Sequence, residues 1–304
     1  MNDLPLVSVI VPTRDRPELL RKTIAAIDAQ DYEGPIEVVV VFDRSDIDPD
    51  IESRRDCRVV RAITNTRKPG LAGGRNSGIE AVSGSYVAFC DDDDIWHSDK
   101  LSKQVAVLEE RPAIEMAVGA IKVHFEGNVT DRVPPMEIIT FTDLLRSRIV
   151  EAHPSTFLFR ASLLNSIGLV DESIPGSYAE DYEYLLRAAR RTDIVIVPDA
   201  IADVLWHTAS FFVENWQTRI DALIYLLELY PEFDSDPHGR ARIEGQISFA
   251  HAAIGNRSEA RRWAFACLRH KPTEKRAMLA LAVSTGLVSA DWVVGRVQSF
   301  GRGI

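Results

Sequence analysis

Apolar runs rich in β-branched residues alternate with a helical pattern in the N-terminal part of this chain. The runs are Val7–Val11, Glu37–Phe42, Arg58–Ala62 and Tyr86–Cys90. A helical pattern extends from Leu19 to Ile27, where Pro17 suits the first turn and Asp15 is a candidate cap. Continuous apolar runs are typical of parallel strands that are buried on both faces. The alternation predicts a doubly wound α/β domain with functional groups at the carboxyl ends of its strands.

Four consecutive aspartates, Asp91–Asp94, follow the run Tyr86–Cys90 directly. Like charges this close repel one another and raise one another's pKa values, so a cluster at a strand end is expected to hold a divalent cation. The alternative is that Asp93 or Asp94 caps a helix beginning near Ile95, although a cap requires one aspartate rather than four.

Composition excludes several classes of protein. With 304 residues, 46% hydrophobic and 26% charged, the chain is long enough for one large domain and a smaller one. A net charge of −10 argues against a nucleic-acid binder. The chain contains neither a GxGxxG motif nor a P-loop lysine pattern, which leaves a dinucleotide or ATP P-loop site without support.

The cysteines and the N-terminal segment indicate the cellular compartment of the protein. Cys57, Cys90 and Cys267 are odd in number, widely spaced and without a CxxC pair, which argues against a disulfide framework and a zinc site. The N-terminal segment enters a strand within a few residues and lacks the basic region of a signal peptide. The expected location is therefore cytoplasmic.

The remaining elements predict two domains. Further strands are expected at Met116–Val129, Phe157–Arg160, Ile194–Val197 and Ile201–His207, and helices at Arg75–Val82, Phe141–Arg148 and Tyr182–Arg190. After Phe212 the pattern is helical, over Trp216–Tyr230, Arg240–Ala253, Glu259–His270 and Ala277–Gly286. We expect an α/β domain over residues 1–212 and a helical domain over 213–304.

A basic segment lies within the helical part. Residues 257–276 carry seven basic and two acidic side chains, just before an apolar stretch that is too short to span a bilayer. Two interpretations stay open, a peripheral contact with an anionic membrane and a solvated helix face.

Five short motifs stand in order along the first domain: Val7–Arg16, Val39–Asp46, Gly74–Gly78, Phe89–Trp96 and Glu180-Asp181. Together they resemble the inverting, metal-dependent glycosyltransferases of family 2, over residues 6 to 210. The resemblance implies the GT-A fold, a Rossmann-like, mostly parallel central sheet flanked by helices. It also implies nucleotide-sugar binding in residues 6–100 and the acceptor and base half in residues 101–212.

The resemblance assigns roles to individual residues. Those implied to bind the nucleotide sugar are Pro12, Thr13, Arg14, Asp15, Asp43, Arg75 and Asn76. Asp43 matches the position that contacts the base, although Phe42 replaces an aspartate that many members have beside it. Asp91-Asp92-Asp93 matches the DxD triplet, in which Asp93 would bind Mn²⁺ or Mg²⁺ and Asp91 or Asp92 would meet the ribose or a metal-bound water.

Glu180-Asp181 matches the family's catalytic element, with Asp181 as the general base that takes the acceptor's proton. An acidic pair at a helix N-terminus is the alternative. His207 is a candidate third metal ligand or a packed or acceptor-site histidine. His153 would line the sugar or acceptor pocket unless it is only a loop residue, and Trp96 is a candidate for contact with the sugar ring.

The implied function is metal-dependent transfer, with inversion, of a hexose from a UDP, GDP or dTDP sugar to a hydroxyl group. The acceptor would be a saccharide or a lipid-linked glycan, in cell-wall, polysaccharide or glycoconjugate synthesis, and the enzyme could form a homodimer. A catalytically idle nucleotide-sugar or metal-binding module is the alternative. A nucleotidyltransferase is disfavoured because Val11–Asp15 lacks the glycine-rich loop of that class.

Overall fold

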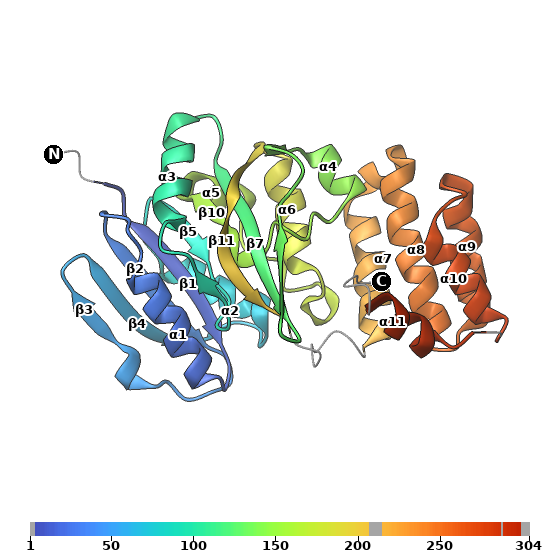
Figure 1. The fold of residues 1–304 in the computed structure, drawn as a ribbon, viewed down its shortest axis with the longest axis horizontal. Coiled ribbons are helices and arrows are strands. Elements are labelled where there is room, and N and C mark those ends of the chain that lie inside the picture. Colours follow the sequence, from blue (N-terminus) through green and yellow to red (C-terminus); the bar gives the residue numbers. More distant parts are fainter. Residues whose placement is uncertain (1–3, 207–214, 287, 299–304) are drawn as a thin grey trace. The chain divides into compact units, whose positions relative to one another are not determined.

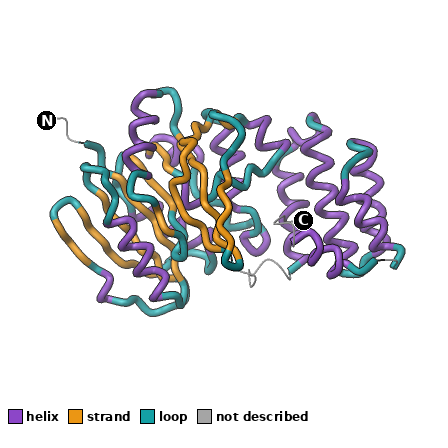
Figure 2. The backbone as a smooth tube through the Cα atoms, viewed as in Figure 1, coloured by secondary structure: helices purple, strands orange, loops and turns teal. Residues whose placement is uncertain are grey.

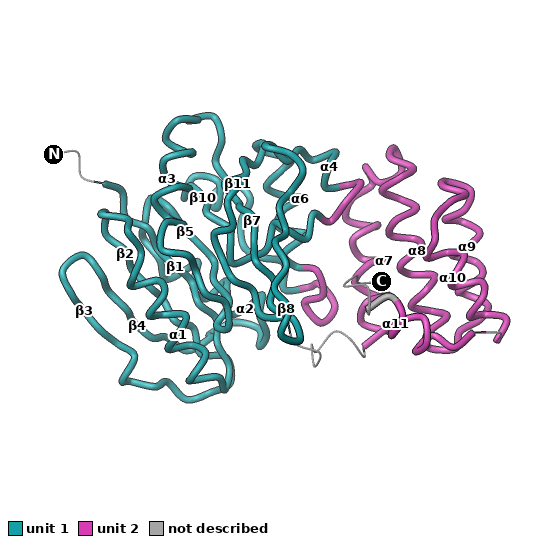
Figure 3. The backbone as a smooth tube through the Cα atoms, in the orientation of Figure 1, with its two compact units in different colours: residues 1–144, 149–172, 180–207 teal, residues 145–148, 173–179, 208–304 magenta. Residues whose placement is uncertain are grey.

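The computed structural model describes residues 4–206, 215–286 and 288–298. The chain divides into two compact units, coloured separately in Figure 3. Unit 1 holds residues 1–144, 149–172 and 180–207, and unit 2 holds residues 145–148, 173–179 and 208–304. Within the described residues, the helices are too short or too polar to cross a membrane.

Unit 1 is built on an 11-stranded sheet, counted over the described residues (Figures 1 and 2). Its strands in chain order are β1 (Val7–Thr13), β2 (Ile36–Phe42), β3 (Ser53–Arg55), β4 (Arg58–Thr64), β5 (Tyr86–Phe89), β6 (Ile95–Trp96), β7 (Met116–Phe125), β8 (Asn128–Arg132), β9 (Ile138–Ile139), β10 (Leu158–Arg160) and β11 (Ile194–Leu205). The order across the sheet is β3-β4-β2-β1-β5-β10-β7-β11-β6, with β8 beside β7 and β9 beside β11. Strands β4, β2, β1 and β5 are mutually parallel, whereas β10 is antiparallel to both β5 and β7.

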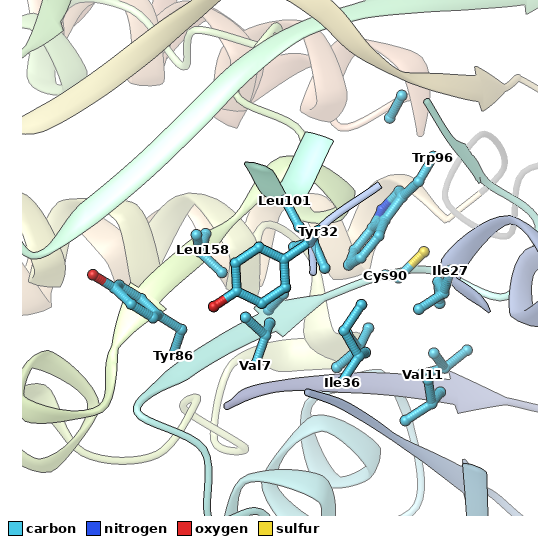
Figure 4. Packing of buried hydrophobic residues seen from close by; sticks show 14 of the residues in the cluster. Val7, Val11, Ile27, Tyr32, Ile36, Tyr86, Cys90, Trp96, Leu101 and Leu158 are labelled. Atoms are coloured by element: carbon cyan, nitrogen blue, oxygen red, sulfur yellow. The ribbon is translucent and has the colours of Figure 1, made fainter. Parts of the chain in front are cut away.

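Helices cover both faces of this sheet. The helices of unit 1 are α1 (Pro17–Asp28), α2 (Leu71–Ala81), α3 (Lys100–Glu110), α4 (Phe141–Arg146, whose last two residues belong to unit 2), α5 (Ala161–Ile167) and α6 (Glu180–Ala189), with 3-10 turns η1 (Pro49–Ile51) and η2 (Pro154–Thr156). Alternate β1 residues such as Val9 share one buried cluster with Ile27 of α1 and Leu101 of α3. Figure 4 shows Trp96 beside Cys90 among the apolar side chains of this cluster.

The opposite face packs against α2 and α6, because successive side chains of a strand point to opposite sides of the sheet. Tyr184 of α6 stacks on Phe89 of β5, with ring centroids 6.0 Å apart. On α2, a Cβ atom at Gly78 would lie 2.3 Å from Cγ2 of Ile10 in β1, so only glycine permits this helix to lie so close to the sheet.

The glycine-rich segment before Arg75 is helical, where the sequence predicts a loop. Helix α2 begins at Leu71 rather than at Arg75. Gly73 lies against the preceding chain, since a Cβ atom there would be 1.8 Å from the carbonyl oxygen of Lys68. The glycines therefore serve close packing inside a helix, which outweighs their low helix propensity.

Four other sequence-based expectations are wrong. The helix expected near Ile95 begins at Lys100, after the short strand β6, so neither Asp93 nor Asp94 caps it. The expected strand Met116–Val129 is a hairpin of β7 and β8 that turns at Gly127, whose φ is 78°. The two strands expected after residue 194 form one irregular strand, β11. Arg16, not Asp15, occupies the N-cap of α1, without a side-chain cap.

Unit 2 is helical throughout its described residues. Its elements are η3 (Pro175–Ser177), α7 (Trp216–Leu229), η4 (Pro231–Ser235), α8 (Pro237–Ala253), α9 (Arg257–His270), α10 (Lys275–Ser284) and α11 (Ala290–Gln298), the last of which the sequence pattern does not predict. Small buried side chains join α8, α9 and α10, namely Ala241, Ala264, Cys267 and Ala277. Small residues at these contacts let the helix axes approach closely, which builds a core from little apolar volume.

Candidate active site

The polar residues that the sequence singles out lie at the carboxyl ends of neighbouring parallel strands in unit 1. Thr13 ends β1, Asp43 follows β2, and Asp91–Asp94 follow β5. β1 pairs with both β2 and β5, so these three strand ends meet at one edge of the sheet. This edge is where open α/β sheets bind their ligands.

A buried arginine joins the first aspartate to the helix α6. The Arg75 guanidinium is 1% exposed, and donates from Nη2 to Asp91 Oδ1 at 2.8 Å and from Nη1 to Glu180 Oε1 at 2.6 Å. Burial by itself would lower the pKa of Arg75, but Asp91, Glu180 and Asp181 outweigh burial and raise the pKa. The permanently charged Arg75 therefore fixes two acidic motifs that lie far apart in sequence.

The next two aspartates contact the loop after β1. Thr13 Oγ1 donates a hydrogen bond to Asp92 Oδ2 at 2.7 Å. Arg16 Nη1 lies 3.3 Å from Asp92 Oδ1 and 2.7 Å from Asp93 Oδ2. Burial raises the pKa of Asp92 above its ordinary value, although the hydrogen bond from Thr13 and the charge of Arg16 act against that rise.

The fourth aspartate is the most buried of the group and lies against the η2 turn. Ser155 Oγ donates a hydrogen bond to Asp94 Oδ2 and accepts one from the Asp91 amide at 2.9 Å. His153 Nδ1 is 3.4 Å from Asp94 Oδ2. Burial, reinforced by the charge of Asp91, raises the pKa of Asp94 well above its usual range, and burial lowers the pKa of the His153 imidazole.

These contacts gather donors that suit a divalent metal. Ligand atoms of Asp91, Asp94 and His153 lie within 4.8 Å of one another. Ligands of an octahedral ion at about 2.1 Å lie about 3 to 4 Å apart, so the cluster is close to the spacing that one Mg²⁺ or Mn²⁺ requires. Oxygen ligands suit both ions and a neutral imidazole suits Mn²⁺, so this donor set fits the predicted metal.

The charges of the site also favour the binding of a divalent metal. The site holds the four consecutive aspartates together with Glu180 and Asp181. In the described part of the chain, two arginines, Arg16 and Arg75, form ion pairs with its aspartates. Burial, together with the charge of Asp91, raises the pKa values of Asp92 and Asp94, and a divalent cation would stabilise the ionised forms of these carboxylates.

Two predicted nucleotide-binding residues are engaged by the protein itself. Asp43 accepts hydrogen bonds from Asn65 Nδ2 at 2.7 Å and from the Gly70 amide at 3.0 Å, which fixes its carboxylate at the end of β2. Asn76 is fully buried, and its side chain bonds both the amide and the carbonyl of Val170. Asn76 thus ties α2 to the chain before η3.

The remaining predicted residues differ in their solvent exposure. Pro12 is buried in β1, whereas Arg14 and Asp15 are exposed, with Asp15 in the left-handed region at φ 53°. Trp96 is 3% exposed within the core, and Lys100 Nζ lies 3.9 Å from the centre of its ring. Asp181 is half-buried at the start of α6. His207 lies outside the described residues.

Sequence reasoning missed Arg16, Asp94 and Ser155 as site residues. Asp94 was expected to hold a cation only as a member of the Asp91–Asp94 cluster and received no role of its own, yet it contacts both Ser155 and His153. Arg16 and Ser155 reach the aspartates from positions more than sixty residues away along the chain. The one available signal was the polar segment His153–Thr156, which precedes a short strand.

Comparisons with known proteins agree with this geometry. The family model described as "Glycosyl transferase family 2" matches residues 8–168. Among curated relatives, the UDP-Glc:alpha-D-GlcNAc-diphosphoundecaprenol beta-1,3-glucosyltransferase WfgD of Escherichia coli is 26% identical over 190 residues, 62% of this chain and 72% of the relative.

Two solved structures share the fold. S. aureus TarS in complex with UDP-GlcNAc has a TM-score of 0.61 and 18% identity, over 90% of this chain and 83% of that chain. The mannosyltransferase PcManGT from Pyrobaculum calidifontis, in complex with GDP-Man and Mn²⁺, has a TM-score of 0.53 and 20% identity, over 93% and 80% of the two chains. These likenesses confirm the predicted GT-A fold. Because the family model covers more than half of the sequence, the chain belongs to glycosyl transferase family 2 and is a glycosyltransferase.

Proposed function

We propose that the protein transfers a sugar from a nucleotide-diphosphate donor to a hydroxyl acceptor, with inversion and with the help of a divalent metal. The observation that carries this proposal is the double ion pair of Arg75, which holds Asp91 of the aspartate cluster and Glu180 of α6 together. A donor-side acidic cluster and an acceptor-side carboxylate are the two parts that such a transfer requires.

The donor would bind at the carboxyl ends of β1, β2 and β5. In this proposal Asp43 contacts the base, Asp91 and Asp93 hold the metal, and Asp94 and His153 supply further donor atoms. The cation, Mn²⁺ or Mg²⁺, would neutralise the diphosphate charge that grows as the glycosidic bond breaks. Arg16 would contribute a second positive charge on the same side, because it already contacts Asp93.

Asp181 is the proposed general base. Glu180 is held by Arg75 at 2.6 Å, so its carboxylate is committed to an ion pair and is a poor proton acceptor. Asp181, the neighbouring carboxylate, would take the proton of the acceptor hydroxyl as its oxygen forms the new bond to the sugar carbon. The nucleoside diphosphate leaves from the opposite face, which gives inversion.

For the acceptor class we propose a saccharide or lipid-linked glycan, in polysaccharide or glycolipid synthesis. WfgD acts, by its name, on a sugar attached to diphosphoundecaprenol. The donors bound to TarS and PcManGT are UDP-GlcNAc and GDP-Man, so UDP and GDP sugars come first in a screen.

The first test is calorimetric titration with UDP, GDP and dTDP and their sugars, with Mn²⁺ or Mg²⁺ and again with EDTA. We expect one nucleotide to bind, and to bind only with metal. Asp93→Ala should abolish the metal-dependent part. A folded protein that binds none of them would favour an idle module over a transferase.

The second test separates chemistry from binding. Asp181→Asn should keep the donor affinity and lower turnover by roughly 10²- to 10⁴-fold, the usual contribution of a general base. Asp199→Asn is a suitable control, because Asp199 is exposed and pairs with Lys103 outside the site. Turnover of Asp181→Asn near that of the control would exclude Asp181 as the base.

A further inference from the structure

A cavity of about 470 Å³ lies within unit 2. Its lining consists of Arg146, His238, Arg242, Lys271, Glu274 and Arg276. All of them belong to unit 2, so the cavity is formed within one compact body. Three arginines, a lysine and a histidine therefore line the cavity with one carboxylate, in a chain whose net charge is −10.

Two glycines of α8 bring these cations together. A Cβ atom at Gly239 would lie 2.5 Å from the carbonyl oxygen of Leu145, so the first turn of α8 packs directly on the segment that carries Arg146. A Cβ atom at Gly245 would lie 3.1 Å from Cγ of Glu274, which lets the start of α10 approach α8. The cavity is thus the product of close backbone packing rather than of loose surface side chains.

Two carboxylates pair with three of the cations that line the cavity. Glu274 is buried and lies 3.3 Å from Lys271 Nζ and 3.2 Å from Arg276 Nη1, so one carboxylate is shared by two cations. Asp236, just outside the lining, holds Arg146 at 2.6 Å. Like charges gathered in a partly enclosed space repel one another more strongly than they do in water, which favours the entry of an anion.

Arg276 also carries one donor atom that the protein leaves unsatisfied. Its Nε atom is buried and has no hydrogen-bond partner within the described residues. A buried donor without a partner is unfavourable, and an oxygen atom of a ligand would satisfy it. The first turn of α10 also lacks a side-chain cap, because Glu274 at the N-cap accepts no hydrogen bond from it.

We propose that this cavity binds a phosphate-bearing anion. Guanidinium groups match phosphate oxygens in two parallel hydrogen bonds, and Arg242 and Arg276 come from different helices, so that they can hold one group between them. The volume accommodates more than a single phosphate, which fits a diphosphate or a phosphodiester with part of its substituent. The anion can be soluble or the headgroup of an anionic phospholipid.

The test uses the full-length protein in EDTA, so that metal-dependent binding at the glycosyltransferase site does not contribute. Inorganic pyrophosphate is titrated calorimetrically at low ionic strength, and flotation is measured with vesicles of phosphatidylcholine with and without phosphatidylglycerol. The variants are Arg276→Gln and Arg242→Gln. Lys275→Gln is the matched control, because Lys275 is exposed, adjacent to Arg276 and absent from the lining.

We expect each cavity variant to weaken binding by about tenfold or more, as loss of a charge-assisted hydrogen bond does, while the control changes it less than about twofold. If the cavity variants lose the binding of pyrophosphate, the anion is soluble. If they lose only the flotation that depends on phosphatidylglycerol, the anion is a lipid headgroup. Absence of both forms of binding in the wild type, or equal binding by variants and control, would overturn the proposal. If the melting temperature shows that a variant is unfolded, hydrogen exchange of the wild-type protein is measured instead. The anion should slow the exchange of the amides in residues 271–276, and unchanged exchange would refute the proposal.

Discussion

Lys100, at the start of α3, should make the stability of the protein depend on pH between 7 and 9. Its side chain is fully buried, donates to Gln104 Oε1 at 2.7 Å and lies over the Trp96 ring. Burial lowers its pKa to about 7 from an ordinary value of 10.5. In the unfolded chain the ammonium regains its ordinary pKa, so unfolding takes up a proton throughout this range.

The direction and the size of this pH dependence follow from the linkage between protonation and folding. Because the unfolded state binds more protons than the folded state between the two pKa values, stability rises with pH above 7. The slope approaches about 1.4 kcal/mol per pH unit, and with the folded pKa at about 7 the gain from pH 7 to pH 9 is about 2 kcal/mol. Below pH 7 the unfavourable charge is fully present in the folded state.

Lys100→Met removes this dependence. The free energy of unfolding is measured with urea for both proteins at pH 7, 8 and 9, and the wild type should gain about 2 kcal/mol relative to the variant. The loss of a donor to Gln104 adds an offset of about 1–3 kcal/mol that does not change with pH. Lys103→Met is the control, because hydrogen bonds to Asp199 and Asp99 raise the pKa of Lys103 and keep it charged in both states. A difference between wild type and Lys100→Met that stays constant from pH 7 to 9 would refute the reasoning.

Three further substitutions test the packing and the charge networks. Gly78→Val should lower the free energy of unfolding by about 1–3 kcal/mol, because even its Cβ would press on Ile10; unchanged urea unfolding would contradict this contact. Asp236→Ala should cost about 1–2 kcal/mol at pH 7 by removing the α8 cap. Burial alone would raise the pKa of Asp236, but the hydrogen bond from the Gly239 amide, together with the hydrogen bond and charge of Arg146, lowers it below the ordinary 3.8. The difference should therefore shrink as denaturation is measured at pH values falling below 3.8, through the lowered folded pKa; persistence there argues against it. Arg75→Met should cost about 3–5 kcal/mol by removing the buried ion pairs with Asp91 and Glu180; urea unfolding equal to that of the wild type would exclude the ion pairs as a source of stability.

Hydrophobic patterning predicted the strands of the nucleotide half well, because β1, β2 and β5 are continuous apolar runs with few competing structures. It failed where packing overrides propensity. The segment from Leu71 reads as a loop because of its glycines, yet Gly73 packs on the carbonyl of Lys68 and Gly74 packs on Pro12 of β1 within a helix. The order of strands beyond β5, with the short β10 inserted between β5 and β7, has no local signal at all.

The site was predictable to the extent that its residues stand in short motifs. The aspartates after β5 and the acidic pair of α6 were found in this way, and the structure joins them through Arg75. Contacts that depend on distant segments were not predictable. Ser155 reaches Asp94 across 61 positions, and Arg16 reaches Asp93 across 77. Sequence spacing does not predict these contacts, because they depend on the topology of the sheet.

The insertion of β10 also has a consequence for synthesis on the ribosome. Leu158 pairs with Ala88, so the outer neighbour of β5 is made about 70 residues later than β5 itself. At elongation rates of about 5–20 residues per second, that delay is roughly 4 to 14 s. During this interval β5 is an apolar edge, open to pairing with other chains, and the aspartates that follow it lack the hydroxyl of Ser155. We therefore expect that a pause in translation during this interval lengthens the exposure of the strand that carries the acidic site.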